Sequence, residues 1–238
     1  MAPTVVPTYC ALCIARCGCL ATVEGGRLIR VDPDPAHPTG QAICVKARAA
    51  PELVAHPERL TTPLLRTRPK GAADPGWRPI SWDEALALAG DKLRAAGPRG
   101  TAFAVATPSG TAVADAFAWI HRLAHHWSSP NLVFATENCN WHRDFGTALT
   151  WGSGLAMPDT EQAATIVLWG SNPAVTWLPL AERVRAAQRR GARLIVVDPR
   201  QGGLANRADL WLAVRPGTDA GLALGLIHLL LDEGGADL

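Results

Sequence analysis

The sequence predicts an α/β protein in which a small β-rich module carrying cysteines precedes a parallel-sheet, Rossmann-like α/β domain. Five of the six cysteines fall within the first fifty residues, and residues 51–80 hold six prolines between the two parts. From Ser81 onward, short apolar runs alternate with helical patterns, which is typical of a parallel sheet. We therefore expect a module over residues 1–60 and an α/β domain over residues 61–238.

The composition describes a soluble globular chain, with 48% apolar and 18% charged residues. A net charge of +2 is too small to indicate a nucleic-acid or membrane-surface partner. The amino terminus lacks the basic and apolar regions of a signal peptide, and the most apolar run, 222–231, is too short to span a bilayer. Because the cysteines cluster instead of forming a disulfide scaffold, we expect metal binding in a reducing, cytoplasmic compartment.

Four cysteines of the module have the spacing C-x2-C-x3-C-x26-C: Cys10, Cys13, Cys17 and Cys44. Three close thiols and one distant thiol can enclose one metal centre, and iron–sulfur clusters are held by four thiolates. Structural zinc sites usually come as two cysteine pairs instead. The spacing favours a [4Fe–4S] cluster, with zinc or unrelated buried or reactive cysteines as alternatives. Cys19 is out of register with the set, and we expect it only to pack.

Between the cysteine triplet and Cys44, residues 23–31 predict a hairpin that turns at Gly25-Gly26. The prolines of residues 51–80 predict an irregular connector. Ser81 and Glu84 have the spacing of a capping box, which opens a helix through about Ala96. A buried strand over 102–106, a long helix over 113–127 and a short strand over 132–134 follow.

The last third of the chain predicts strands over 165–169, 193–197 and 210–214, and helices over 180–190 and 218–232. Ligands bind parallel sheets at the carboxyl ends of the strands. The residues there that we expect to bind a cofactor are Gly170, Ser171, Asn172, Asp198, Pro199, Arg200, Gly217, Thr218 and Asp219. Each loop alone could be an ordinary turn. Three such loops on one edge of the sheet favour a nucleotide-binding site. In such a site, glycines allow the backbone to approach a phosphate, and carboxylates accept hydrogen bonds from ribose hydroxyls or a purine amine. The sequence has no G-x-G-x-x-G, which disfavours an ordinary nicotinamide site.

A lone cysteine, Cys139, follows the predicted strand 132–134. A lone cysteine is usually a small buried hydrophobe. Its neighbours argue against simple burial, because Glu137, His142 and Arg143 are polar and capable of acid–base chemistry. A thiolate is a good ligand for a soft metal. His142 is the one imidazole in this loop, which makes it the candidate for proton transfer.

These motifs together resemble the molybdopterin oxidoreductases of the dimethyl-sulfoxide-reductase superfamily, from Cys10 to about Gly234. The resemblance depends on the cysteine set with Lys46, Ser81-Trp82-Asp83-Glu84-Ala85, Gly170-Ser171-Asn172-Pro173, Val197-Asp198-Pro199-Arg200 and Arg215-Pro216-Gly217-Thr218-Asp219. It implies that the four cysteines carry a [4Fe–4S] cluster. It also implies that Lys46 lies between cluster and pterin, and that the three loops contact one molybdopterin guanine dinucleotide.

By the same resemblance, Cys139 has the position of the protein ligand to molybdenum or tungsten. Cysteine there is similar to formate dehydrogenases, nitrate reductases, thiosulfate or polysulfide reductases and acetylene hydratase. Formate dehydrogenases place histidine directly after this ligand, whereas Asn140 and Trp141 intervene here, which disfavours formate oxidation.

The family's catalytic subunits are much longer than this chain. We therefore expect an amino-terminal portion that is inactive alone and that works with a small-molecule substrate and with an electron-transfer protein or subunit. The competing interpretations are a non-catalytic Fe–S electron-transfer or assembly protein and a zinc-stabilised binding module.

Overall fold

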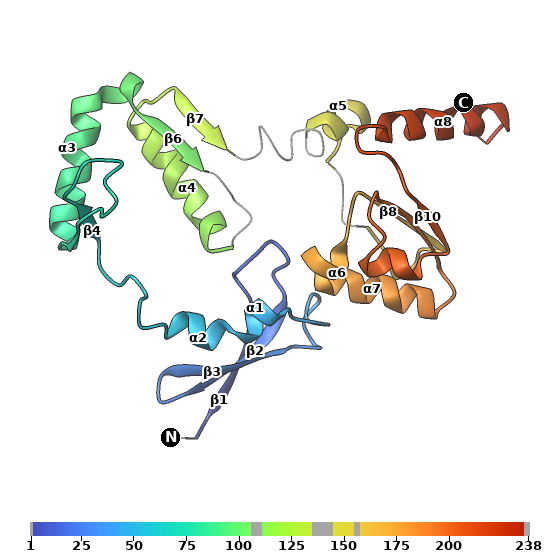
Figure 1. Ribbon diagram of the computed structural model, residues 1–238, viewed down its shortest axis with the longest axis horizontal. Coiled ribbons are helices and arrows are strands. Elements are labelled where there is room, and N and C mark those ends of the chain that lie inside the picture. The colour runs from blue at the N-terminus through green and yellow to red at the C-terminus, as the bar shows by residue number, and fades with distance from the viewer. Residues whose placement is uncertain (1, 106–110, 135–144, 155–157, 236–238) are drawn as a thin grey trace. The chain divides into compact units, whose positions relative to one another are not determined.

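The computed structural model describes residues 2–105, 111–134, 145–154 and 158–235 (Figure 1). The chain forms two compact units. The first contains Met1–Arg16, Ala21–Val31 and Val45–Ala156, and the second contains Cys17–Leu20, Asp32–Cys44 and Met157–Leu238. In the described part of the chain, no helix is both long and apolar enough to cross a membrane.

Three strands form the amino-terminal sheet: β1 (Thr4–Tyr9), β2 (Gly18–Glu24) and β3 (Arg27–Pro33), in the order β1-β2-β3. The predicted hairpin is confirmed between β2 and β3. Its two turn residues, Gly25 and Gly26, have φ of 56° and 78°, a conformation that glycine adopts without steric cost. Two short helices, α1 (Val45–Arg48) and α2 (Ala50–Val54), follow the loop after β3.

The proline-rich stretch is more regular than the sequence predicts. Besides α2, it contains β4 (Leu64–Arg66) and β5 (Trp77–Pro79), which pair antiparallel with Leu65 opposite Arg78. The Thr67 hydroxyl donates to the Gly76 carbonyl at 2.6 Å, which closes this hairpin. Proline is compatible with a two-stranded ribbon because both strands are edges, where an amide donor can be absent.

Helix α3 (Trp82–Gly100) begins at the predicted cap, since the Glu84 amide donates to Ser81 Oγ at 3.1 Å. The Glu84 carboxylate accepts from Arg78 at 2.9 Å, so the ion pair takes the place of the reciprocal half of a capping box. Helical geometry breaks at Gly97, one residue after the predicted end.

Strands β6 (Ala102–Val105) and β7 (Asn131–Phe134) are parallel, with α4 (Thr111–His126) between them in sequence. The prediction of a buried strand over 102–106 is wrong for the described residues, because Ala102 and Ala104 are exposed. Side chains of the loop before β7 secure this pair: Ser129 Oγ donates to the Thr101 carbonyl at 2.7 Å. Helix α5 (Thr147–Trp151) also belongs to the first unit.

The second unit is built on a parallel sheet of β8 (Thr165–Trp169), β9 (Arg193–Val197) and β10 (Leu210–Leu212), in the order β10-β9-β8. Its helices are α6 (Pro173–Thr176), α7 (Leu178–Arg189), the 3-10 helix η3 (Gly203–Arg207) and α8 (Asp219–Asp232). The predicted α/β class with parallel strands is therefore confirmed. The bounds of β8 and β9 agree with those expected from the sequence.

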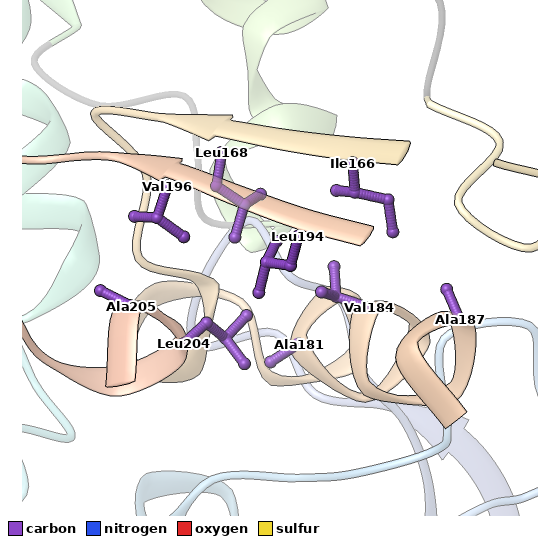
Figure 2. Close-up of a cluster of buried hydrophobic side chains, with 9 residues drawn as sticks. All are labelled: Ile166, Leu168, Ala181, Val184, Ala187, Leu194, Val196, Leu204 and Ala205. Carbon is purple, nitrogen blue, oxygen red and sulfur yellow. The ribbon is translucent and has the colours of Figure 1, made fainter. Parts of the chain in front are cut away.

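The core of the second unit lies between the sheet and the helices α7 and η3. Figure 2 shows side chains of these two helices pointing toward those of β8 and β9. The buried residues are Ile166, Leu168, Ala181, Val184, Ala187, Leu194, Val196, Leu204 and Ala205. This packing holds the strand ends, where the predicted binding loops begin, on a rigid base.

Candidate functional site

Two of the predicted cluster cysteines, Cys10 and Cys13, lie in the first unit. Cys10 directly follows β1 and Cys13 lies in the next turn, where the Cys13 carbonyl accepts from the Arg16 amide at 3.4 Å. Both side chains are half-buried. Lys46 also belongs to this unit and is an exposed residue of α1.

The other two cluster cysteines, Cys17 and Cys44, lie in the second unit. Cys17 is 6% exposed and directly precedes β2, and Cys44 is half-buried just before α1. Cys19, inside β2, is 2% exposed, as the packing interpretation expects. All five described cysteines are thiols and not disulfides. Within the described ranges, no three Cys, His, Asp or Glu side chains form a ready-made metal site.

A small pocket lies at the carboxyl ends of β8 and β9. It brings together residues from the first two predicted binding loops with residues of the segment that leads into η3. Its lining consists of Ser171, Asn172, Val196, Asp198, Arg200, Gly202, Leu204 and Ala205. The Gly170 amide donates to the Val197 carbonyl at 2.8 Å, so the two strand ends stay together as the loops diverge.

Asn172 is the unusual residue of this pocket. Its Oδ1 is buried and has no hydrogen-bond partner in the described part of the chain. The Asn172 carbonyl instead accepts from the amides of Val175 and Thr176 at 3.0 and 3.1 Å, which begins α6. A buried acceptor without a donor costs about 1–3 kcal/mol. A ligand that donates a hydrogen bond to Oδ1 would offset that cost.

Gly203 lies against Asn172 and is a position that the sequence reasoning did not single out. A Cβ built on Gly203 would lie 2.5 Å from Asn172 Oδ1, and its φ is 57°. Only glycine therefore allows this close approach of backbone and amide. The pair Gly202-Gly203, a few residues after a predicted strand, is the signal that could have indicated it.

The second loop is fixed by local and distant bonds. Asp198 Oδ1 accepts from the Arg200 amide at 2.7 Å, and the Asp198 carbonyl accepts from Trp211 Nε1 at 2.8 Å. Arg200 and Pro199 are exposed at the mouth of the loop. The loop thus presents a carboxylate and a guanidinium at one strand end, a combination suited to sugar hydroxyls and phosphate.

The third loop is separate from this pocket: none of the described lining residues comes from Gly217, Thr218 or Asp219. The Thr218 hydroxyl donates to the Arg215 carbonyl at 2.8 Å, which shapes the turn before α8. Asp219 Oδ1 accepts from Trp169 Nε1 at 2.6 Å. The first and third loops are therefore linked by a side-chain bond. Cys139 and His142 lie outside the described residues.

Known proteins similar to this chain share both of its parts. Residues 3–56 match the model for the molybdopterin oxidoreductase Fe4S4 domain, and residues 59–237 match the model for molybdopterin oxidoreductase. The thiosulfate reductase molybdopterin-containing subunit PhsA of Salmonella typhimurium is 30% identical over 237 residues, which is 97% of this chain and 30% of that protein.

Dopamine dehydroxylase of Eggerthella lenta is 31% identical, over 96% of this chain and 23% of its own length. The structure of acetylene hydratase from Pelobacter acetylenicus superimposes with a TM-score of 0.82 at 27% identity. The superposition includes 97% of this chain and 32% of the acetylene hydratase chain. The chain thus spans about a third or less of these relatives.

Proposed function

The chain belongs to the molybdopterin oxidoreductase family, and we propose that it supplies the cluster-bearing and first dinucleotide-binding part of a molybdenum or tungsten oxidoreductase. One observation carries this proposal: the Fe4S4 and molybdopterin segments follow one another at 3–56 and 59–237, and one relative aligns across both. We place the boundary between them near residue 60. Two-electron chemistry on a small-molecule substrate is the proposed activity of the whole protein, in the cytoplasm.

In this proposal the thiolates of Cys10, Cys13, Cys17 and Cys44 hold a [4Fe–4S] cluster. The donor set fits, since these cysteines are thiols and iron–sulfur clusters require four thiolates. Such a cluster supplies one-electron transfer to and from a partner protein or subunit. Lys46, exposed on α1, provides a positive charge between cluster and pterin.

The loops at the carboxyl ends of β8, β9 and β10 are proposed to contact one molybdopterin guanine dinucleotide, of which the small pocket between the first two loops would meet only a part. Arg200 supplies positive charge for a phosphate, and Asp198 accepts from sugar hydroxyls. Support comes from Asn172, whose Oδ1 is buried and has no hydrogen-bond partner among the described residues. Gly170, Ser171, Pro199, Gly217 and Thr218 shape the surrounding loops. Asp219, held by Trp169, can accept from the amino group of guanine.

Cys139 is proposed as the thiolate ligand to molybdenum or tungsten, and His142 as the group that moves a proton near it. When bound, this metal centre supplies the exchange of electron pairs with the substrate. A second candidate function is a non-catalytic Fe–S electron carrier or assembly protein, which the four-cysteine spacing also allows.

Metal analysis with pterin extraction on anaerobically purified protein tests these alternatives. Molybdenum or tungsten with guanine dinucleotide supports the proposed function, whereas iron alone supports the electron carrier. Zinc as the sole metal would overturn both and favour a zinc-stabilised binding module.

A further inference from the structure

Arg183 connects helix α7 to the loop that precedes Cys44. Its Nη2 donates to the Pro38 carbonyl at 2.6 Å, across 145 residues of sequence. Its Nε lies 3.2 Å from Glu161 Oε1, and the Arg183 side chain is 24% exposed. All three residues belong to the second unit. The guanidinium therefore donates a hydrogen bond to a backbone carbonyl and forms an ion pair with a carboxylate, while its buried Nε makes no hydrogen bond within the described residues.

The loop that Arg183 contacts is bonded to the residue after Cys17. We define residues 34–40 as the Pro38 loop. The Asp34 amide donates to the Gly18 carbonyl at 3.2 Å, and the Gly18 amide donates to Thr39 Oγ1 at 3.2 Å. Gly18 is buried, and the His37 ring lies directly against it. A displacement of the Pro38 loop would therefore displace the backbone next to Cys17.

The same loop also leads into Cys44. The Pro38 carbonyl accepts a second bond, from Gln41 Nε2 at 2.9 Å, so it holds the start of the segment that ends at Cys44. Ile43, the residue before Cys44, is 6% exposed and anchors that segment in the interior. The Pro38 carbonyl thus lies at the junction between the backbone of Cys17 and that of Cys44.

The other end of the connection is rigid. Ala181 and Val184, which flank Arg183 on α7, are both 0% exposed and belong to the core of the second unit. Such packing leaves the helix little freedom to move. Through its bond to the Pro38 carbonyl, the Arg183 guanidinium therefore holds the Pro38 loop at a fixed position relative to α7 and the core of the second unit.

We propose that Arg183 is a positioning residue for the thiolate ligands Cys17 and Cys44. Arg183 fixes the Pro38 loop to α7. It thereby influences two properties of the cluster, the rate at which iron is lost and the electronic environment of the iron. This inference rests on the proposed function, in which these cysteines ligate a [4Fe–4S] cluster. Groups outside the ligand shell that orient ligands commonly change metal retention and tune the metal.

The test compares three proteins after anaerobic reconstitution with iron and sulfide: the wild type, Arg183→Met and a control, Arg185→Met. Arg185 lies on the same helix, pairs with Glu182 and has a side chain 30% exposed, close to that of Arg183. We measure iron release to a chelator, the EPR spectrum of the reduced cluster, and its midpoint potential. Arg183→Met should release iron about 10-fold faster, with altered EPR g-values and potential. Arg185→Met should match the wild type.

Arg183→Lys provides a second variant, because one ammonium cannot reproduce both contacts of the fork. It should release iron at a rate between those of the wild type and Arg183→Met, and it decides the question if Arg183→Met does not fold. Wild-type iron release and EPR in the folded Arg183 variants would overturn the positioning role while leaving the proposed function standing. A wild-type protein that binds zinc and forms no cluster would overturn the proposed function and this inference together.

Discussion

The indole Nε1 of Trp169 donates to Oδ1 of Asp219 at 2.6 Å, which joins the end of β8 to the first residue of α8. The two residues are 50 positions apart in sequence. The bond occupies one oxygen of the carboxylate and orients the other. In the proposed dinucleotide site, Trp169 therefore prepares Asp219 to accept from a purine amine without taking part in the recognition itself.

Replacing Trp169 by phenylalanine removes this donor and keeps an aromatic ring. A hydrogen bond to a charged group stabilises a protein more than a bond between neutral groups, but exposure to solvent weakens this one. We therefore expect the free energy of unfolding to fall by about 1 kcal/mol. Urea unfolding measures the change. Trp82→Phe is the control, since Trp82 is 66% exposed and should alter stability little. Equal stability of the Trp169 and Trp82 variants would contradict a contribution from the bond.

Asn172→Ala should separate ligand binding from folding. The Asn172 side chain makes no capping bond to α6, and its carbonyl, which does, is retained in alanine. Because alanine also removes the buried, unpaired Oδ1, the ligand-free variant should be at least as stable as the wild type, by up to about 1–3 kcal/mol. Binding of GDP, a probe for the dinucleotide, should weaken about 10-fold, because one hydrogen bond of about 1.4 kcal/mol is lost.

Isothermal titration with GDP, alongside thermal unfolding without it, makes both measurements on the same preparations. Thr176→Val is a useful comparison, because it removes a hydroxyl that binds the Asn172 carbonyl outside the pocket lining. It should lower stability slightly and leave GDP binding intact. Undiminished GDP binding by Asn172→Ala would remove Asn172 from the proposed site.

Two adjacent glycines provide a matched pair for the close approach in the pocket. Gly203→Ala places a Cβ 2.5 Å from Asn172 Oδ1 at a φ of 57°, and should lower the free energy of unfolding by about 1–3 kcal/mol. Gly202→Ala meets nothing within 4 Å and has an extended φ of −173°, so it should be nearly neutral. Urea unfolding of both variants is the measurement. Similar losses at the two positions would show that contact with Asn172 is unimportant.

The sequence predicted best those elements whose signals are local. The strands β8 and β9 are apolar, β-branched runs that end at Gly170 and Asp198, so their bounds could be predicted. The cap of α3 was predictable for the same reason, through Ser81 and Glu84. By contrast, the β4–β5 pair and η3 are too short to show a periodic pattern. The prolines around β4 and β5 also indicated an irregular connector instead of strands.

The sequence did not predict how the candidate loops are grouped in space. The order of the strands allowed three loops to share one edge, yet the pocket unites only those of Asn172 and Asp198 among the described residues. Asp219 is instead held by Trp169, and Pro38 by Arg183. Such bonds between distant residues depend on how loops pack in three dimensions, which spacing along the chain does not encode.

Cys17 and Cys19 offer the most direct test of the cysteine assignment, because burial does not distinguish them. They are 6% and 2% exposed and two residues apart, so a general effect of losing a buried thiol should be similar at both. Only Cys17 has the spacing of the cluster set. After anaerobic reconstitution, Cys17→Ala should lose most of the broad absorption near about 400 nm that thiolate-ligated iron gives, together with bound iron.

Cys19→Ala should keep the absorption and the iron content, and should lose at most about 1 kcal/mol of stability, as for a small buried hydrophobe. Cys44→Ala should behave like Cys17→Ala, because the distant thiol closes the same centre. Iron content and absorption spectra of the three variants are sufficient to decide. If Cys19→Ala lost the cluster while Cys17→Ala retained it, the ligand register inferred from the spacing would be wrong.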